Sequence, residues 1–159
     1  MPRWTGTWLE GPGVTLGELR HPDRYPGERL GLPREGTGAL APFGARLLAF
    51  TVDILASALV AGLINVWVSD PSAAERQAAA FAVLAVEHVL LVALTGQTLG
   101  MRLMGLKVLR FKDITRPPGF LPALIRTVPL LLTLGLTGFF TKEGRGLHDL
   151  AAGTVVIRA

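Results

Sequence analysis

Three long apolar runs divide the chain after residue 42 into candidate membrane helices. The first extends from Leu47 to Val68, the second lies within residues 72–95, and the third extends from Phe120 to Phe140. As a helix, the first run is about 33 Å long, which is enough to cross the hydrocarbon of a bilayer. The second has an apolar stretch of about 18 residues, close to the minimum for a crossing. The pattern predicts an all-α integral membrane protein with three transmembrane helices.

The third run contains residues that disturb helices, so a straight and uniform helix is not expected there. Pro122 and Pro129 lack a backbone N–H, and Gly135 and Gly138 weaken a helix interior. A kinked span and a re-entrant hairpin both fit, because irregular backbone at membrane depth is tolerated where protein covers it. We favour three full spans, with a re-entrant third segment as the alternative.

Basic residues between the runs indicate how a multi-pass protein of the cell membrane would be oriented. The segment between the second and third runs is rich in arginine and lysine, whereas the turn between the first two offers only Arg76. The positive-inside rule places this basic segment and the N-terminus in the cytoplasm. A complete third span would put the C-terminus outside, but Lys142, Arg145 and Arg158 favour the inside, so the side of the C-terminus stays open.

The segment 96–110 is amphipathic and interrupted by glycines. One interpretation is a cytoplasmic helix at the membrane surface, with apolar side chains at the headgroup boundary and basic side chains against lipid phosphates. The apolar set is Leu99, Leu103, Met104 and Leu106, and the basic set is Arg102, Lys107 and Arg110. Alternatively, residues 106–111 form a short strand, whose natural partner is the β-branched run 154–157. That pairing would place the C-terminus on the cytoplasmic side.

Residues 1–41 are rich in proline and glycine and carry balanced charge. Such a composition buries little apolar surface, so we expect an N-terminal tail that is mostly extended or loosely ordered. Trp4 and Trp8 are exceptions, whose indole rings either rest at the membrane interface or are simply exposed. The chain therefore divides into a tail, residues 1–41, and a membrane domain, residues 42–157.

Composition agrees with a membrane protein and excludes several functional classes. Half of the 159 residues are hydrophobic and none is cysteine, so disulfides, thiolate metal sites and cysteine nucleophiles are excluded. The formal net charge of +4 comes from basic residues beside apolar runs, so it reports orientation rather than nucleic-acid binding. No nucleophile with a base and an orienting group is readable, and we expect neither an enzyme nor a bound cofactor or metal.

Four ionisable side chains from the three runs fall at a similar depth. Asp53 lies about 9 Å from the cytoplasmic end of the first run, and Arg126 lies about 9 Å into the third. In the second run, Glu87 and His88 lie about 12 and 10.5 Å from the cytoplasmic end. Because isolated charges are costly in hydrocarbon, we predict one cluster, with Arg126 near Asp53 or Glu87. His88 lies beside them, and Arg46, on the same helix face as Asp53, lies at the rim.

The predicted cluster has two interpretations. Buried opposite charges can simply hold short helices together. Alternatively, a carboxylate and a histidine at one depth can bind a cation or relay protons, while the charge of Arg126 tunes them. Glu87 and His88 are adjacent on one helix and do not share a face, so one of the two is expected to point inward.

Asp149 lies in the sequence Leu-His-Asp-Leu-Ala-Ala-Gly-Thr of residues 147–154. As a cap of a short helix over residues 150–152 it needs no metal, and we favour that interpretation over ligation. Together with Arg46, Asp53 and the segment Gly-Gln-Thr-Leu-Gly-Met-Arg-Leu-Met-Gly-Leu-Lys-Val of residues 96–108, this sequence resembles the RDD family of small bacterial membrane proteins.

The family name refers to one arginine and two aspartates, which match Arg46, Asp53 and Asp149 of this chain. The match covers residues 42–157, and Asp149 thereby joins the predicted cluster. Met101 is a departure, because the family often has a lysine before the arginine. The resemblance implies an integral membrane protein with a role in transport, and at least one relative exchanges alkali cations for protons.

Two functions from different classes follow. The first is a transporter or transporter subunit, in which Asp53 with Glu87 or His88 binds a cation or protons. Three spans without an internal repeat are few for alternating access, so a homo-oligomer or a larger membrane complex is expected. The second is a non-catalytic accessory subunit or scaffold that docks on a larger membrane complex through the tail or the charge cluster. The expected partners are membrane lipids and membrane proteins, without nucleic acid.

Overall fold

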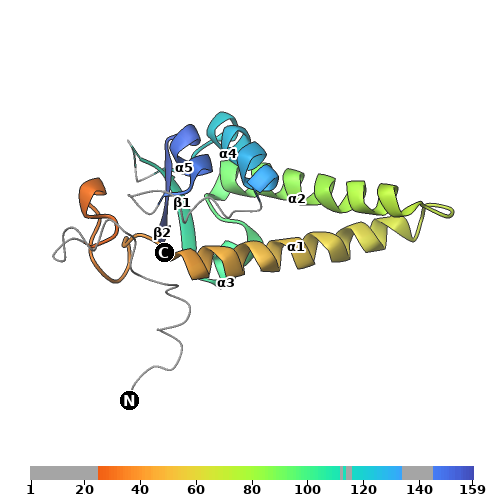
Figure 1. The fold of residues 1–159 in the computed structure, drawn as a ribbon, viewed down its shortest axis with the longest axis horizontal. Coiled ribbons are helices and arrows are strands. Elements are labelled where there is room, and N and C mark those ends of the chain that lie inside the picture. The colour runs from red at the N-terminus through yellow and green to blue at the C-terminus, as the bar shows by residue number, and fades with distance from the viewer. Residues whose placement is uncertain (1–24, 112, 114–115, 134–144) are drawn as a thin grey trace, which may run out of the picture.

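The computed structural model describes residues 25–111, 113, 116–133 and 145–159, and it is mostly helical. Two 23-residue helices, α1 (Phe43–Asn65) and α2 (Ala73–Thr95), form a long hairpin (Figure 1). The other elements gather at its open end, where α1 begins and α2 ends. They are a 3-10 helix η2 (Glu28–Leu30), α3 (Leu99–Leu103), β1 (Leu106–Arg110), α4 (Phe120–Thr133), α5 (Leu147–Ala152) and β2 (Thr154–Arg158).

Local sequence explains where the hairpin helices begin and end. At the start of α2, Ser72 Oγ accepts a hydrogen bond from the Glu75 N–H at 3.2 Å, and the Glu75 carboxylate accepts one from the Ser72 N–H at 2.7 Å. Gly96 ends α2 with a φ of 73°, a left-handed conformation that favours glycine. The first two predicted runs are confirmed as helices long and apolar enough to cross a membrane, although α1 begins at Phe43 rather than Leu47.

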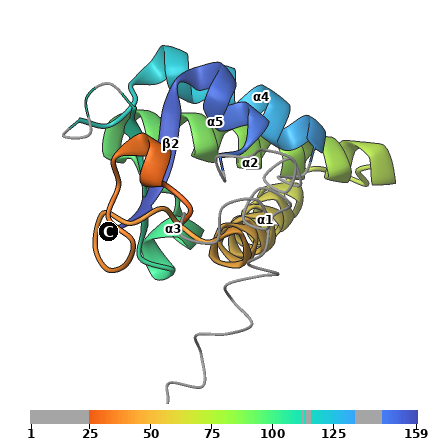
Figure 2. The same ribbon diagram turned by 60° about the vertical axis from the view of Figure 1, so that its left-hand side comes forward.

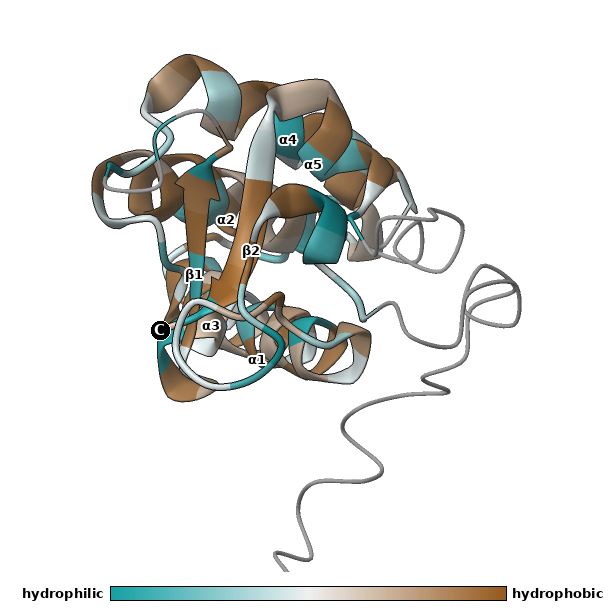
Figure 3. Ribbon diagram, turned by 90° about the vertical axis from the view of Figure 1, so that its left-hand side faces the viewer, coloured by the Kyte–Doolittle hydropathy of each residue, from teal (hydrophilic) through white to brown (hydrophobic). Residues whose placement is uncertain are grey.

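A two-stranded antiparallel sheet joins distant parts of the chain at the open end of the hairpin. β1 pairs with β2 so that Val108 lies opposite Val156, and both strands are mainly hydrophobic (Figure 3). The alternative prediction of paired strands is therefore confirmed, and the all-α prediction lacked this sheet. The segment before α1 extends it, because the Gly38 N–H donates to Arg158 O at 2.8 Å and the Ala41 N–H to Val156 O at 3.0 Å.

The part of the predicted tail that the structure describes, residues 25–41, is thus packed against the membrane domain. Leu32, Ala39 and Ala41 are buried, and the Tyr25 hydroxyl donates to Leu32 O at 3.0 Å. Loose order is therefore wrong for these residues, because backbone hydrogen bonds to β2 compensate for their low apolar content, although residues 38–41 are extended beside β2. Trp4 and Trp8 lie outside the described residues.

The prediction of one amphipathic helix over residues 96–110 is wrong. α3 has five residues, and the chain then turns at Gly105, whose φ is 64°, into β1. Leu106 is 1% exposed and belongs to the core, rather than lying at a headgroup boundary, whereas Leu103 is 70% exposed. The glycine turn lets the apolar side chains of this segment point both outward and into the core, which one helix face does not allow.

The prediction of three spans is not confirmed. α4 has 14 residues, about 21 Å, which is shorter than a bilayer's hydrocarbon. It packs on α2 and α5 at the open end of the hairpin, and it contains Pro129 in its interior (Figure 2). The rest of the predicted third run, from residue 134 onward, lies outside the described residues. After it, α5 and β2 return the chain to the sheet beside the start of α1.

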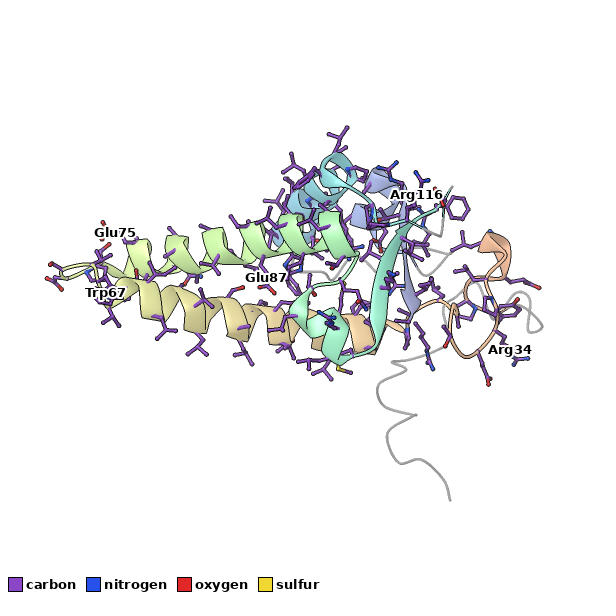
Figure 4. The ribbon with its side chains drawn as sticks, turned by 180° about the vertical axis from the view of Figure 1, so that it is seen from behind. Arg34, Trp67, Glu75, Glu87 and Arg116 are labelled. Atoms are coloured by element: carbon purple, nitrogen blue, oxygen red, sulfur yellow. The ribbon has the colours of Figure 1, made fainter. Side chains whose placement is uncertain are left out.

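The hairpin carries apolar side chains on its outer surface. On α1, Leu55, Leu59 and Leu63 are more than 60% exposed, and on α2 Leu94 is 61% exposed. Figure 4 shows Trp67 and Glu75 at the tip of the hairpin, far from the sheet. The apolar middle of the hairpin matches the hydrocarbon of a bilayer, and its polar ends match the two interfaces.

We expect the two ends of the described chain to be accessible from one side of the membrane and the hairpin tip from the other. The chain has no native cysteine, so Arg34→Cys, Ala159→Cys and Asp70→Cys each introduce a single thiol. In sealed vesicles, an impermeant thiol reagent should label Cys at 34 and 159 from the same side and Cys at 70 from the opposite side. Labelling of positions 34 and 159 from opposite sides would contradict the paired strands.

Candidate functional site

Asp53 is fully buried, and its carboxylate is held by the turn that opens α3. Oδ2 accepts a hydrogen bond from Thr98 Oγ1 at 2.6 Å, and Oδ1 accepts one from the Gly100 N–H at 2.6 Å. Gly100 is required by close approach, because a Cβ there would lie 2.0 Å from Ala49 O. Asp53 therefore fixes α3 directly against α1.

His88 of α2 faces Asp53 from the other helix of the hairpin. Its Nε2 lies 3.7 Å from Asp53 Oδ2, and its Nδ1 lies 3.2 Å from Leu84 O. Because a carbonyl oxygen only accepts, Nδ1 carries a proton and Nε2 is the atom presented to the carboxylate. Nε2 is buried and has no hydrogen-bond partner in the described part of the chain. Phe50 packs edge-on against the ring at 5.7 Å between centroids, which holds its orientation.

Asp149 is the second buried carboxylate, and it lies at the centre of a group of basic side chains. Arg126 of α4 donates to its Oδ1, and Arg46 of α1 places Nη1 3.6 Å from its Oδ2. Thr154 Oγ1 donates to Oδ1 at 3.2 Å, and the Gly146 N–H donates to Oδ2 at 3.4 Å. The last bond holds the start of α5, so Asp149 also has the expected capping role, from the third position of a helix that begins at Leu147.

The six residues predicted to form one cluster thus fall into two buried groups, Asp53 with His88 and Asp149 with Arg46 and Arg126, while Glu87 makes a separate hydrogen bond. The carboxylate that Arg126 contacts is that of Asp149, rather than that of Asp53 or Glu87, near which it was predicted to lie. Glu87 accepts a hydrogen bond from Ser57 Oγ at 2.9 Å, between the hairpin helices (Figure 4). His88 points inward while Glu87 is half-buried, as expected for neighbours on different faces. Depth along a helix gives the level of a side chain but not the direction in which it points.

The three residues predicted to contact lipid headgroups have different surroundings. Arg102 is exposed on α3, and Lys107 is half-buried on β1. Arg110 ends β1 and donates from Nε to Pro118 O at 2.7 Å, so it has a structural role within the protein. Contact of these residues with headgroups stays a prediction.

Several residues of the site were missed in the sequence. Arg145 is buried, donates to Thr154 O and Asp149 O, and lies 5.0 Å from the Phe111 ring centroid. Thr98 was missed as the partner of Asp53. A signal was present, since Thr98 directly precedes a short helix and fits the N-cap pattern. For Arg145 no periodic pattern marks the position.

Burial and charge shift the titration of the two α5 side chains. Burial lowers the pKa of His148 to about 4, although the negative charge of Asp149 opposes this change. For Asp149, burial alone raises the pKa, but the surrounding positive charges, Arg126 first, and the Thr154 hydrogen bond outweigh it. The pKa of Asp149 is therefore lowered, and the carboxylate is ionised and His148 neutral near pH 7.

Among the described residues, no group of three histidine, cysteine or carboxylate side chains is placed to hold a metal ion. A model of the RDD family matches residues 40–153, well over half of the chain. The chain belongs to the RDD family. No curated protein and no solved structure matches it. In this RDD protein, Arg46 and Asp149, to which the resemblance assigns the arginine and second aspartate of the family name, lie in contact, and Asp53, to which it assigns the first aspartate, is bound by α3.

We expect Asp149→Asn to destabilise the protein by about 3–5 kcal/mol, the typical cost of breaking a buried ion pair. Arg126→Gln should cost less, because Arg46, Thr154 and the Gly146 N–H still face the carboxylate. The double variant should lose less than the sum of the two single losses, since the residues are in contact. Unfolding in mixed micelles of increasing dodecyl sulfate measures these free energies. Strict additivity would contradict the contact.

We also expect stability to fall on acidification, in part because of His148. Its folded pKa of about 4 lies below the usual value of 6.5, so the unfolded state binds the proton first as pH falls. The free energy of unfolding should decrease by about 3 kcal/mol between pH 6.5 and 4 from this residue. Asp149 acts in the same direction at lower pH. Unfolding curves of His148→Gln should lack the contribution of this residue, and a pH profile identical to that of the wild type would refute the assignment.

Proposed function

We propose that this RDD protein is a membrane transporter subunit that binds a proton between Asp53 and His88. The observation that carries the proposal is the contact of His88 Nε2 with Asp53 Oδ2 at 3.7 Å, inside the two-helix hairpin. We therefore assign the proposed proton site to these two residues rather than to Glu87, which is hydrogen-bonded to Ser57.

Without a shared proton, the contact between His88 and Asp53 is unfavourable. Nδ1 of His88 is committed to Leu84 O, so a neutral ring presents a lone pair at Nε2 to the carboxylate. A proton on either group turns this repulsion into a favourable polar contact. The unpartnered Nε2 is therefore the place where a proton changes the interaction between α1 and α2.

The Asp149 site differs in this respect and serves as an internal comparison. Both oxygens of its carboxylate accept hydrogen bonds, and two guanidinium groups supply compensating charge. Such a site holds α1, α4 and α5 together without needing a proton. Asp53 has its two hydrogen bonds on the α3 side, but on the α2 side it faces a group that itself titrates.

Two long apolar helices do not enclose a pathway by themselves, so the proposed function includes a second copy of the chain or another membrane subunit. The presence of only two long apolar helices in the described residues also supports the second candidate function, an accessory subunit in a larger membrane complex. The two are distinguished by flux, because an accessory subunit moves no protons when it is reconstituted alone. The molecular mass of the protein in nanodiscs reports whether it forms an oligomer.

The test is proton movement in liposomes that contain the purified protein and a pH-sensitive dye, driven by an opposing gradient of sodium or potassium ions. Wild-type protein should move protons, whereas Asp53→Asn and His88→Gln should each reduce the rate at least tenfold, because each removes one of the two groups that share the proton. Asp70→Asn is the matched control, since it makes the same chemical change at an exposed turn and should retain the wild-type rate.

Each outcome of this test has a defined consequence. Absence of flux from folded wild-type protein would overturn the transporter proposal and favour the accessory role. Wild-type flux in both Asp53→Asn and His88→Gln would keep transport but remove this pair from it. The folded state of each variant is checked by its thermal unfolding midpoint in detergent.

A further inference from the structure

A small cavity lies beside the Asp149 site, at the end of the hairpin where α1 begins. Its volume is about 30 Å³, which is space for about two water-sized groups. Arg46 and Arg126 line it together with His88, His148 and apolar side chains of α1, α3 and α4. Leu47, 37% exposed, is its most exposed lining residue and marks the opening.

The two arginines present unused donors at this cavity. Nε and Nη2 of Arg46 and Nε of Arg126 are buried and have no hydrogen-bond partner in the described part of the chain. Arg126 is 2% exposed. Leaving a buried charged donor unsatisfied is costly, so these atoms call for an acceptor that the described residues do not supply.

The charge around the cavity is also unbalanced. Two buried or mostly buried guanidinium groups, those of Arg46 and Arg126, contact the single carboxylate of Asp149. Arginine stays protonated in proteins, and His148 is neutral near pH 7. The described residues that line the cavity include two arginines and no carboxylate.

We propose that this cavity binds the anionic oxygens of a phosphate group, supplied by an acidic lipid headgroup or by free phosphate. Guanidinium groups bind phosphate oxygens through paired N–H donors, and the two groups approach from different helices. Arg46 is the fourth residue of α1, so the cavity lies near the membrane boundary, at the level of lipid phosphates. His88 also lines the cavity, but the donors that carry this proposal belong to the two arginines, so the proposal does not depend on proton movement.

Binding is tested on the purified full chain through its thermal unfolding midpoint, because a ligand of the folded state raises that midpoint. Inorganic phosphate is titrated in a maltoside detergent, with gluconate keeping the ionic strength constant. In parallel, the midpoint is compared between phosphatidylcholine nanodiscs with and without phosphatidylglycerol. We expect a saturable rise with phosphate, with phosphatidylglycerol, or with both, and these responses identify the source of the phosphate group.

Three variants assign the response to the cavity. Arg46→Gln removes unused donors and should weaken the apparent affinity at least about tenfold, the effect of losing a charged hydrogen bond. Leu47→Trp obstructs the opening without changing any charge and should weaken binding as well. Arg34→Gln makes the same charge change at an exposed loop position and should respond like wild type.

The proposal is overturned if neither phosphate nor phosphatidylglycerol raises the wild-type midpoint. It is also overturned if Arg46→Gln and Leu47→Trp respond as wild type does, because the effect would then arise elsewhere on the protein. Since Leu47→Trp keeps Arg46 and Arg126 intact, a folding defect of the arginine variant does not prevent this decision.

Discussion

Asp149 is a buried carboxylate, and its burial requires hydrogen-bond donors on all sides. This requirement determines how the elements pack at the open end of the hairpin. A charge in a low-dielectric environment needs both an opposite charge and hydrogen bonds. Arg126 brings α4 to the site, Arg46 brings α1, and Thr154 brings the start of β2. The strand pairing then follows, because β2 begins beside Asp149 and runs along β1.

Asp53 imposes a second constraint of the same kind but with a different outcome. Its oxygens are bound by Thr98 and the Gly100 backbone, so the turn after α2 is fastened to α1. On its other side, His88 presents Nε2 without a hydrogen bond. The carboxylate of Asp149 therefore has hydrogen bonds and compensating charge on all sides. The carboxylate of Asp53 instead faces His88, whose protonation changes the contact. That contrast is the basis of our proposal that the proton site lies at Asp53, whereas Asp149 holds helices together.

The sequence was informative where a pattern along one element was enough. Apolar runs of sufficient length predicted both hairpin helices, and the β-branched run 154–157 indicated the partner of β1. A costly carboxylate in an apolar run pointed to Asp53, and helix rise placed it at the level of His88. The sequence could not show that Arg126 reaches Asp149, because that depends on how α4 is rotated and where α5 returns. Nor could the sequence show that residues 96–110 turn at Gly105 into a strand. There, tertiary packing decides between helix and strand.

The central claim, that a proton is shared between Asp53 and His88, is tested most directly by the ¹⁵N chemical shifts of the His88 ring over a pH titration. The chain has three histidines, so spectra of His21→Gln, His148→Gln and the wild type assign the signals of His88. The account predicts that Nδ1 stays protonated throughout, while Nε2 gains a proton as pH falls, and that Asp53→Asn changes the titration of Nε2. A ring protonated at Nε2 and unprotonated at Nδ1 over the whole range, or a titration unaffected by Asp53→Asn, would contradict it.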